Sequence, residues 1–144
     1  MSRQSLTYVA LQFVCSAALV LSVQWRAISA LAVSASVLGG VISVVAVLTV
    51  RPRQVSVASE VKAEATLVRS GPYRWIRHPM YVGLILFTLG FVFASFHWWK
   101  LAVWVVLIVV LHLKAAFEER LLAERFPEYD SYRKVTKRFV PFIY

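Results

Sequence analysis

Three long stretches of this chain contain no Asp, Glu, Lys or Arg, and this absence limits what the chain can fold into. They cover residues 4–25, 27–50 and 79–99. An α-helix rises about 1.5 Å per residue, so roughly 20 residues cross the ~30 Å core of a lipid bilayer. Each stretch is therefore long enough to span a membrane. The first exceeds the usual core of a signal peptide and a second follows directly, so we expect a true first helix.

A fourth apolar run, residues 101–113, is too short to span the bilayer alone. It becomes long enough if Trp98 and Trp99 lie in one interface and the helix carries Lys114 toward the other, where a lysine can snorkel into water. The sequence therefore predicts an all-α, multi-pass integral membrane protein with about four transmembrane helices among membrane lipids.

The basic residues lie almost entirely on one side of these predicted helices. The chain has 16 Lys and Arg against 7 Asp and Glu, a net charge of +9. All but Arg26 and Lys100 fall before the first helix, between the second and third, or at and beyond the end of the fourth. This positive-inside pattern places both termini in the cytoplasm. It explains the charge without a nucleic-acid partner.

The first two predicted helices, within residues 1–50, read as a hairpin that serves as scaffold. Gly39 and Gly40 lie at the centre of the second helix, among Ser and Ala, which suits close helix packing in lipid. Cys15 is the single cysteine, and we expect it to be a packing residue. The three histidines are scattered, so no metal site is expected. Four helices bury little surface between them, which is compatible with a homodimer.

After a cytoplasmic linker, residues 51–66, a dense polar segment at residues 70–81 precedes the third helix. Pro79 fits the first turn of that helix, which places His78 at the N-cap. The free N–H groups of a helix start suit an anion such as a carboxylate. Tyr81 follows His78 by three residues and Arg77 by four, so it can share their face. The same helix carries a smooth stripe for a neighbouring helix or a ligand, formed by Gly83, Gly90 and Ala94.

The fourth helix continues into a polar end, where His112, Ala116 and Glu119 fall on one face beside Glu118. Beyond it, near-helical spacing of apolar residues among basic ones predicts an amphipathic helix on the membrane surface. The apolar residues are Tyr129, Tyr132, Val135 and Phe139. Two helix ends, a polar segment and a basic tail thus converge at one membrane depth, which suits a polar ligand carrying both charge signs.

Each of these charged residues also has a purely structural interpretation. Arg74 and Arg77 would serve equally well as interfacial anchors. Glu118 and Glu119 would form a solvated helix end that pairs with Arg120. These alternatives stay open at the level of the sequence.

Two separated elements resemble the isoprenylcysteine carboxyl methyltransferase family and its relatives among phospholipid methyltransferases. They are the Arg77-His78-Pro79-x-Tyr81 motif, within residues 70–83, and the paired Glu118-Glu119 at a downstream helix end. The resemblance covers about residues 67–144, roughly half the chain. It also includes Leu122, Phe126, Tyr129, Tyr132, Val135 and Arg138.

The resemblance implies a membrane methyltransferase that uses S-adenosylmethionine, with residues 67–144 as its catalytic part. The residues it places at the cofactor are Arg77, His78, Pro79, Tyr81, Glu118 and Glu119. Those it places nearer the acceptor, or closing the pocket, are Tyr129, Tyr132 and Arg138. The implied acceptor is lipophilic or amphipathic, and is a carboxylate, a thiol or a lipid amine.

The same residues are compatible with three rival functions. The first is N-methylation of a phospholipid, and the second is a non-catalytic binding or assembly role that retains the fold. The third is a membrane reductase with a nicotinamide cofactor, because the ending at residues 138–144 is similar to that of membrane sterol reductases. A preference for a nicotinamide cofactor over S-adenosylmethionine would distinguish the reductase from a methyltransferase.

Overall fold

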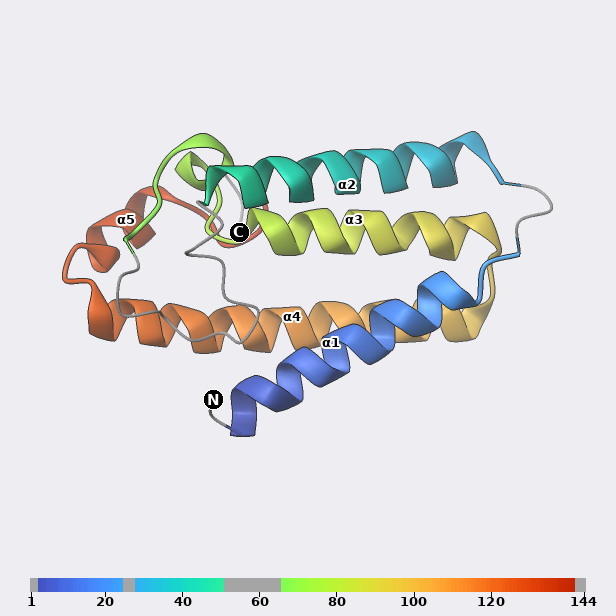
Figure 1. Cartoon of the computed structure of the whole chain (residues 1–144), viewed down its shortest axis with the longest axis horizontal. Coiled ribbons are helices and arrows are strands. Elements are labelled where there is room, and N and C mark those ends of the chain that lie inside the picture. Colours follow the sequence, from blue (N-terminus) through green and yellow to red (C-terminus); the bar gives the residue numbers. More distant parts are fainter. Residues whose placement is uncertain (1–2, 25–27, 51–65, 142–144) are drawn as a thin grey trace.

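The computed structural model describes residues 3–24, 28–50 and 66–141. Helices α2, α3 and α4 lie with their long axes along one direction, and α1 crosses α4 obliquely (Figure 1). They are α1 (Arg3–Leu21), α2 (Ala30–Thr49), α3 (Pro79–Ala94), α4 (Trp98–Arg125) and α5 (Tyr129–Val135), with a short 3₁₀ helix, η1 (Gly71–Arg74), before α3. The predicted all-α membrane fold is confirmed. Residues 25–27, most of the linker and residues 142–144 lie outside the described residues.

The closest helix pair is α2 with α3, and glycines make it possible. A Cβ added at Gly83 would lie 2.7 Å from the carbonyl oxygen of Gly39, and one at Gly90 would lie 2.5 Å from that of Ala32. The two backbones therefore touch, and a side chain at either glycine would separate them. The smooth stripe expected on α3 thus faces a neighbouring helix. Gly39 takes part in this contact, whereas Gly40 meets only the edge of Phe87 at 3.9 Å.

A small apolar core joins the other helices. Cys15 and Leu19 of α1 pack with Val92 of α3 and with Leu107 and Leu111 of α4. Cys15 is a buried free cysteine within this cluster, as expected of a packing residue.

The third helix is shorter than its uncharged run, residues 79–99, whereas the fourth extends from Trp98 and Trp99 past Lys114, as the prediction required. α3 has 16 residues, about 24 Å, whereas α4 has 28 residues, about 42 Å. Within the described residues, three helices, α1, α2 and α4, are long and apolar enough to cross a membrane, and α3 is a shorter apolar helix. The physical reason for the shorter α3 is a turn around Ser95, which divides the uncharged run before Trp98 and Trp99, the first residues of α4. Absence of charge predicts burial in lipid but does not predict where a helix ends.

The end of the bundle at the α3–α4 turn is closed by a buried lysine. Lys100 is 1% exposed. Its Nζ donates to the carbonyl oxygen of Ser22, 2.9 Å away just beyond α1, and to the hydroxyl of Ser95. This end lies far from α5 (Figure 1), in agreement with the separation of Lys100 from most of the basic residues.

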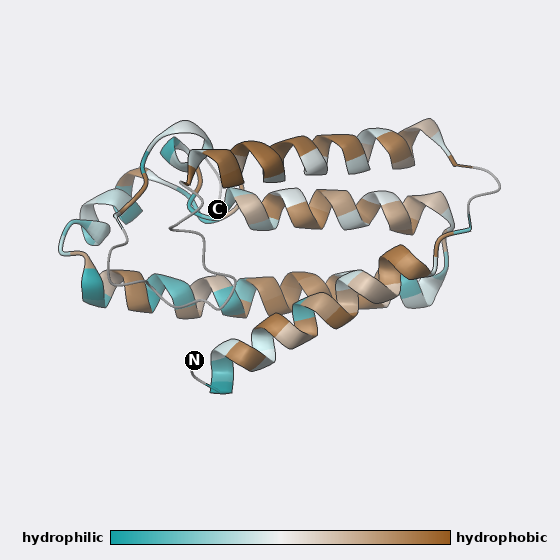
Figure 2. Ribbon diagram, viewed as in Figure 1, coloured by the Kyte–Doolittle hydropathy of each residue, from teal (hydrophilic) through white to brown (hydrophobic). Residues whose placement is uncertain are grey.

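Polarity is concentrated at the opposite end of the bundle. Figure 2 shows apolar residues along the lengths of α1, α2 and α3, with hydrophilic residues gathered on the last turns of α4 and in α5. The expected amphipathic helix is short. Tyr129 and Tyr132 are buried, but Val135 is 79% exposed, and Phe139 lies beyond the helix end. The prediction of a common face was wrong for Phe139, because the backbone becomes extended at Thr136. It was also wrong for Val135, which lies within α5 but about 120° around the helix from Tyr129.

Candidate functional site

A short backbone pairing brings the polar segment and the tail together. The N–H of Arg77 donates to the carbonyl of Lys137 at 2.8 Å, and that of His78 donates to the carbonyl of Arg138 at 3.2 Å. The N–H of Lys137 returns a bond to Trp75 at 3.1 Å, which completes a parallel bridge beside Ile76. This pairing is possible because the chain is extended after α5. It sets three basic or imidazole side chains at the start of α3, beside the last turns of α4.

His78 is the N-cap residue of α3, with Pro79 in the first turn, as the sequence predicted. Its ring makes no capping hydrogen bond and is turned toward α4 instead. The Nε2 atom lies 3.1 Å from Glu119, and Nδ1 lies 3.7 Å from Glu118. The ring stacks on Tyr81 with centroids 5.3 Å apart and planes 3° apart. Tyr81 therefore shares the face of His78, in agreement with the spacing.

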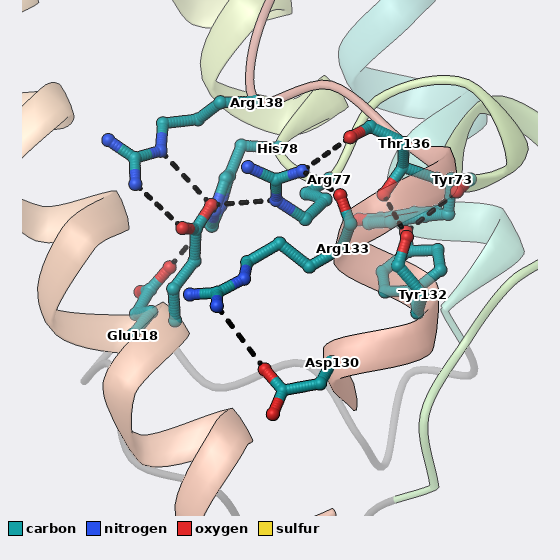
Figure 3. A network of polar contacts seen from close by, with 10 residues as sticks. Tyr73, Arg77, His78, Glu118, Asp130, Tyr132, Arg133, Thr136 and Arg138 are labelled. Carbon is teal, nitrogen blue, oxygen red and sulfur yellow. Dashed lines mark hydrogen bonds and ion pairs between the residues drawn. The ribbon is translucent and has the colours of Figure 1, made fainter. Parts of the chain in front are cut away.

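Glu119 is the centre of the site. Its Oε1 accepts hydrogen bonds from the Nε of Arg77 at 2.9 Å and from the Nε of Arg138 at 3.1 Å. Its Oε2 accepts from the Nη2 of Arg138 at 2.7 Å. In Figure 3, Arg77 from the segment before α3 and Arg138 from the tail approach one carboxylate from two sides, and His78 lies beside it. Charge-assisted bonds of this kind are short and strong.

The interpretation of Glu119 as part of a solvated helix end is therefore wrong. Its side chain is 5% exposed and that of Arg77 is 9% exposed. A carboxylate so buried is retained only when it is paired and hydrogen-bonded. Arg77 is more than an interfacial anchor, because its Nη1 also donates to the carbonyls of Thr136 at 2.6 Å and Arg133 at 3.3 Å. One guanidinium thus caps the C-terminus of α5 and pairs with α4.

Glu118 is held differently from Glu119. Its Oε1 accepts the hydroxyl hydrogen of Tyr81 at 2.6 Å, and its side chain is 18% exposed. Glu119 is thus bound by two arginines inside the protein, whereas Glu118 is bound by a neutral hydroxyl and lies nearer the surface. Of the two glutamates, Glu118 has the more accessible carboxylate.

The two tyrosines of α5 are buried beside this cluster. The hydroxyl of Tyr132 donates to the carbonyl of Tyr73 at 2.7 Å, whereas that of Tyr129 is buried and finds no hydrogen-bond partner in the part of the chain that the structure describes. Burial raises the pKa of Tyr132 to about 12 and, together with the charge of Glu119, raises the pKa of Tyr129 well above its usual value. Both phenols are neutral donors at physiological pH.

One basic residue lies beside the site where the sequence did not predict it. Lys114 was expected to snorkel into water, but it is 3% exposed inside the bundle. Its Nζ donates to the Oε1 of Gln12 in α1 at 2.9 Å and lies 5.2 Å from the centre of the Tyr81 ring. The available signal was its spacing, because Lys114 precedes Glu118 by one helical turn.

The residues that the resemblance assigns to a cofactor are thus brought together. Arg77, His78, Tyr81, Glu118 and Glu119 form one contiguous group, joined by Arg138. The buried tyrosines flank it on α5. Within one small volume the group offers guanidinium, imidazole, carboxylate, phenol and an aromatic face.

Comparison with known proteins agrees with the resemblance. The sequence pattern of the phospholipid methyltransferase family matches residues 25–129, which is most of the chain. One curated relative is the cobalt-zinc-cadmium resistance protein CzcN of Cupriavidus metallidurans, which is 40% identical over 80 residues. The match covers 53% of this chain and 36% of the relative, so the chain spans little more than a third of that protein's length.

Proposed function

Because this chain belongs to the phospholipid methyltransferase family, we propose that it is an integral membrane methyltransferase that uses S-adenosylmethionine. Its acceptor is a lipophilic or amphipathic molecule that reaches the site from the bilayer, while the cofactor enters from water. Both termini and the site face the cytoplasm in this proposal. The distribution of basic residues supports that orientation.

The observation that carries the proposal is the group of opposite charges around Glu119. S-adenosylmethionine has a carboxylate, an ammonium and a sulfonium, so its pocket must offer both charge signs. Arg77 and His78 suit the carboxylate. Glu118 suits the ammonium or the ribose hydroxyls, because it has the more accessible carboxylate of the pair. The Tyr81 ring suits a cation on its face. The residues present therefore fit the cofactor.

When bound, the cofactor supplies an activated methyl group for an in-line displacement. The chain's own residues then have to align the acceptor and exclude water more than to supply a strong base. Glu119 fixes the directions of Arg77 and Arg138 by binding both. The neutral hydroxyl of Tyr129 has hydrogen-bonding capacity to spare and is suited to hold a polar group of the acceptor.

The family description favours a phospholipid as the acceptor, and this suits the lipid amine among the alternatives. A carboxylate and a thiol are the other candidate acceptors. A non-catalytic binding role is the rival outside the enzyme class. The saturation of Glu119 by the protein's own arginines favours this rival, because a self-paired cluster is stable without turnover. Incubation with radiolabelled S-adenosylmethionine and membranes of defined lipids separates these alternatives. A methylated lipid identifies the acceptor, and binding without product identifies the rival.

The first experiment is calorimetric titration of the detergent-purified protein with S-adenosylmethionine and S-adenosylhomocysteine. We expect micromolar binding of both ligands, which share the carboxylate and ammonium. A folded sample that binds neither would overturn the proposal. Preference for a nicotinamide cofactor would instead support a membrane reductase.

A further inference from the structure

Helix α4 contains two buried lysines, and their surroundings differ in kind. Lys100 and Lys114 are 1% and 3% exposed. An ammonium inside an apolar helix is costly and needs partners that offset its lost hydration. The partners of each lysine therefore indicate why it is retained.

The surroundings of Lys100 are those of a structural residue. Its Nζ binds the carbonyl of Ser22, just beyond the C-terminus of α1, and the hydroxyl of Ser95 at the α3–α4 turn. Carbonyls at a helix end lack intrahelical donors and attract cations. Lys100 thus satisfies helix ends at the side of the bundle away from the site.

The surroundings of Lys114 lead into the site. Gln12 of α1 accepts its hydrogen bond at 2.9 Å, and the Tyr81 ring lies 5.2 Å from its Nζ. The hydroxyl of the same tyrosine donates to Glu118 at 2.6 Å. The charge of Glu118, one helical turn along α4, also attracts the ammonium. Lys114 therefore contacts one member of the Tyr81–Glu118 pair and is drawn electrostatically to the other.

We propose that Lys114, held by Gln12, is a positioning residue that orients Tyr81 and Glu118 for the cofactor. This inference rests on the proposed function, because Glu118 is the carboxylate assigned to the cofactor's ammonium or ribose. It also gives α1 a part in the site, since Gln12 belongs to the hairpin expected to be only a scaffold. Gln12 and Lys114 together connect that hairpin to the binding residues.

The test is a double-mutant cycle on S-adenosylmethionine affinity, measured by calorimetry in detergent. Lys114→Met should weaken binding about tenfold in the wild-type background and less than about twofold in the Glu118→Gln background. A residue that acts through Glu118 loses its effect when Glu118 is changed, whereas a purely structural residue does not. Tyr81→Phe provides a second background that removes the intervening hydroxyl without altering charge. Lys114→Arg, which keeps a cation, should restore part of the affinity.

Lys100→Met is the matched control, because it removes an equally buried lysine from the same helix. It should lower the melting temperature and change the affinity less than about twofold in each background. The inference is overturned if Lys114→Met has no larger effect than Lys100→Met, or if its effect persists at full size without Glu118. If Lys114→Met does not fold, Gln12→Leu takes its place, with about a threefold loss expected. A wild type that binds no cofactor overturns the proposed function itself, and the inference with it.

Discussion

Both ends of the helix bundle enclose basic side chains, but the two ends are held together by different kinds of contact. At the α3–α4 turn, Lys100 is bound by a backbone carbonyl and a serine hydroxyl. At the opposite end, two arginines and a histidine surround Glu119, and its neighbour Glu118 accepts from a tyrosine. Backbone carbonyls are available at every helix end, whereas a buried carboxylate with two guanidinium partners requires several specific side chains.

The difference teaches where stability and function are coupled. Removing a contact at the turn end should cost stability alone. Removing one at the site end should cost both stability and ligand affinity, because the same side chains hold the fold and would hold the ligand. The site end also closes the chain on itself, since Arg77 binds both α4 and the carbonyls at the end of α5.

The largest effect is expected from Glu119→Gln. The substitution leaves Arg77, 9% exposed, and the part-buried Arg138 without their shared carboxylate. Breaking a fully buried pair typically costs about 3–5 kcal/mol, and the part exposure of Arg138 places the cost at the lower end. Thermal unfolding followed by circular dichroism should show a much lower melting temperature, and calorimetry should show no cofactor binding. Glu124→Gln is the control, because Glu124 is exposed on the same helix. Equal effects of the two substitutions would return Glu119 to the role of a solvated helix end.

The next effect concerns the glycines that join α2 to α3. Gly83→Ala and Gly90→Ala each push a Cβ into the backbone of α2, and overpacking of this kind costs about 1–3 kcal/mol. We expect both to lower the melting temperature, but only Gly83→Ala to weaken cofactor binding, since it lies two residues from Tyr81. Gly40→Ala should be close to neutral, because a Cβ there meets only Phe87 at ordinary contact distance. If Gly83→Ala and Gly90→Ala bind the cofactor with the same affinity, the packing of α3 against α2 does not affect the site.

His78→Ala should separate affinity from stability at the site end. The ring contributes an interaction with Glu119, but two arginines keep that carboxylate paired. We expect about a tenfold loss of S-adenosylmethionine affinity, roughly 1.4 kcal/mol, with a smaller fall in melting temperature. Calorimetry and thermal unfolding on the same preparation check this. Unchanged affinity would remove His78 from the proposed cofactor site.

The smallest effects are expected from the two tyrosines of α5. Tyr132→Phe loses the hydrogen bond to Tyr73 and should cost about 1 kcal/mol of unfolding free energy. Tyr129→Phe removes a buried hydroxyl that lacks a partner among the described residues, so stability should hold or rise slightly. If the hydroxyl of Tyr129 holds the acceptor, methyl transfer falls while cofactor affinity stays constant. A stability loss in Tyr129→Phe as large as that in Tyr132→Phe would show that its hydroxyl is bonded after all.

Much of this arrangement was predictable because it depends on local physics. Long uncharged runs predict helices in lipid, since unpaired charges are costly there. The position of Pro79 predicts the helix start and the N-cap at His78, and the glycines of α3 predict a close neighbour. The helical spacing of Tyr81 after His78 predicts their shared face, which the stacked rings confirm.

Other features were decided only by the tertiary structure. The turn at Ser95 shortens α3, the extended backbone at Thr136 shortens α5, and Gln12 draws Lys114 into the bundle. The sequence placed Glu118 and Glu119 side by side but could not separate them. Adjacent helical residues point about 100° apart, so which one becomes buried depends on where Arg77 and Arg138 arrive from distant parts of the chain. Periodicity is a property of one helix, whereas the pairing of a buried charge is a property of all the elements that enclose it.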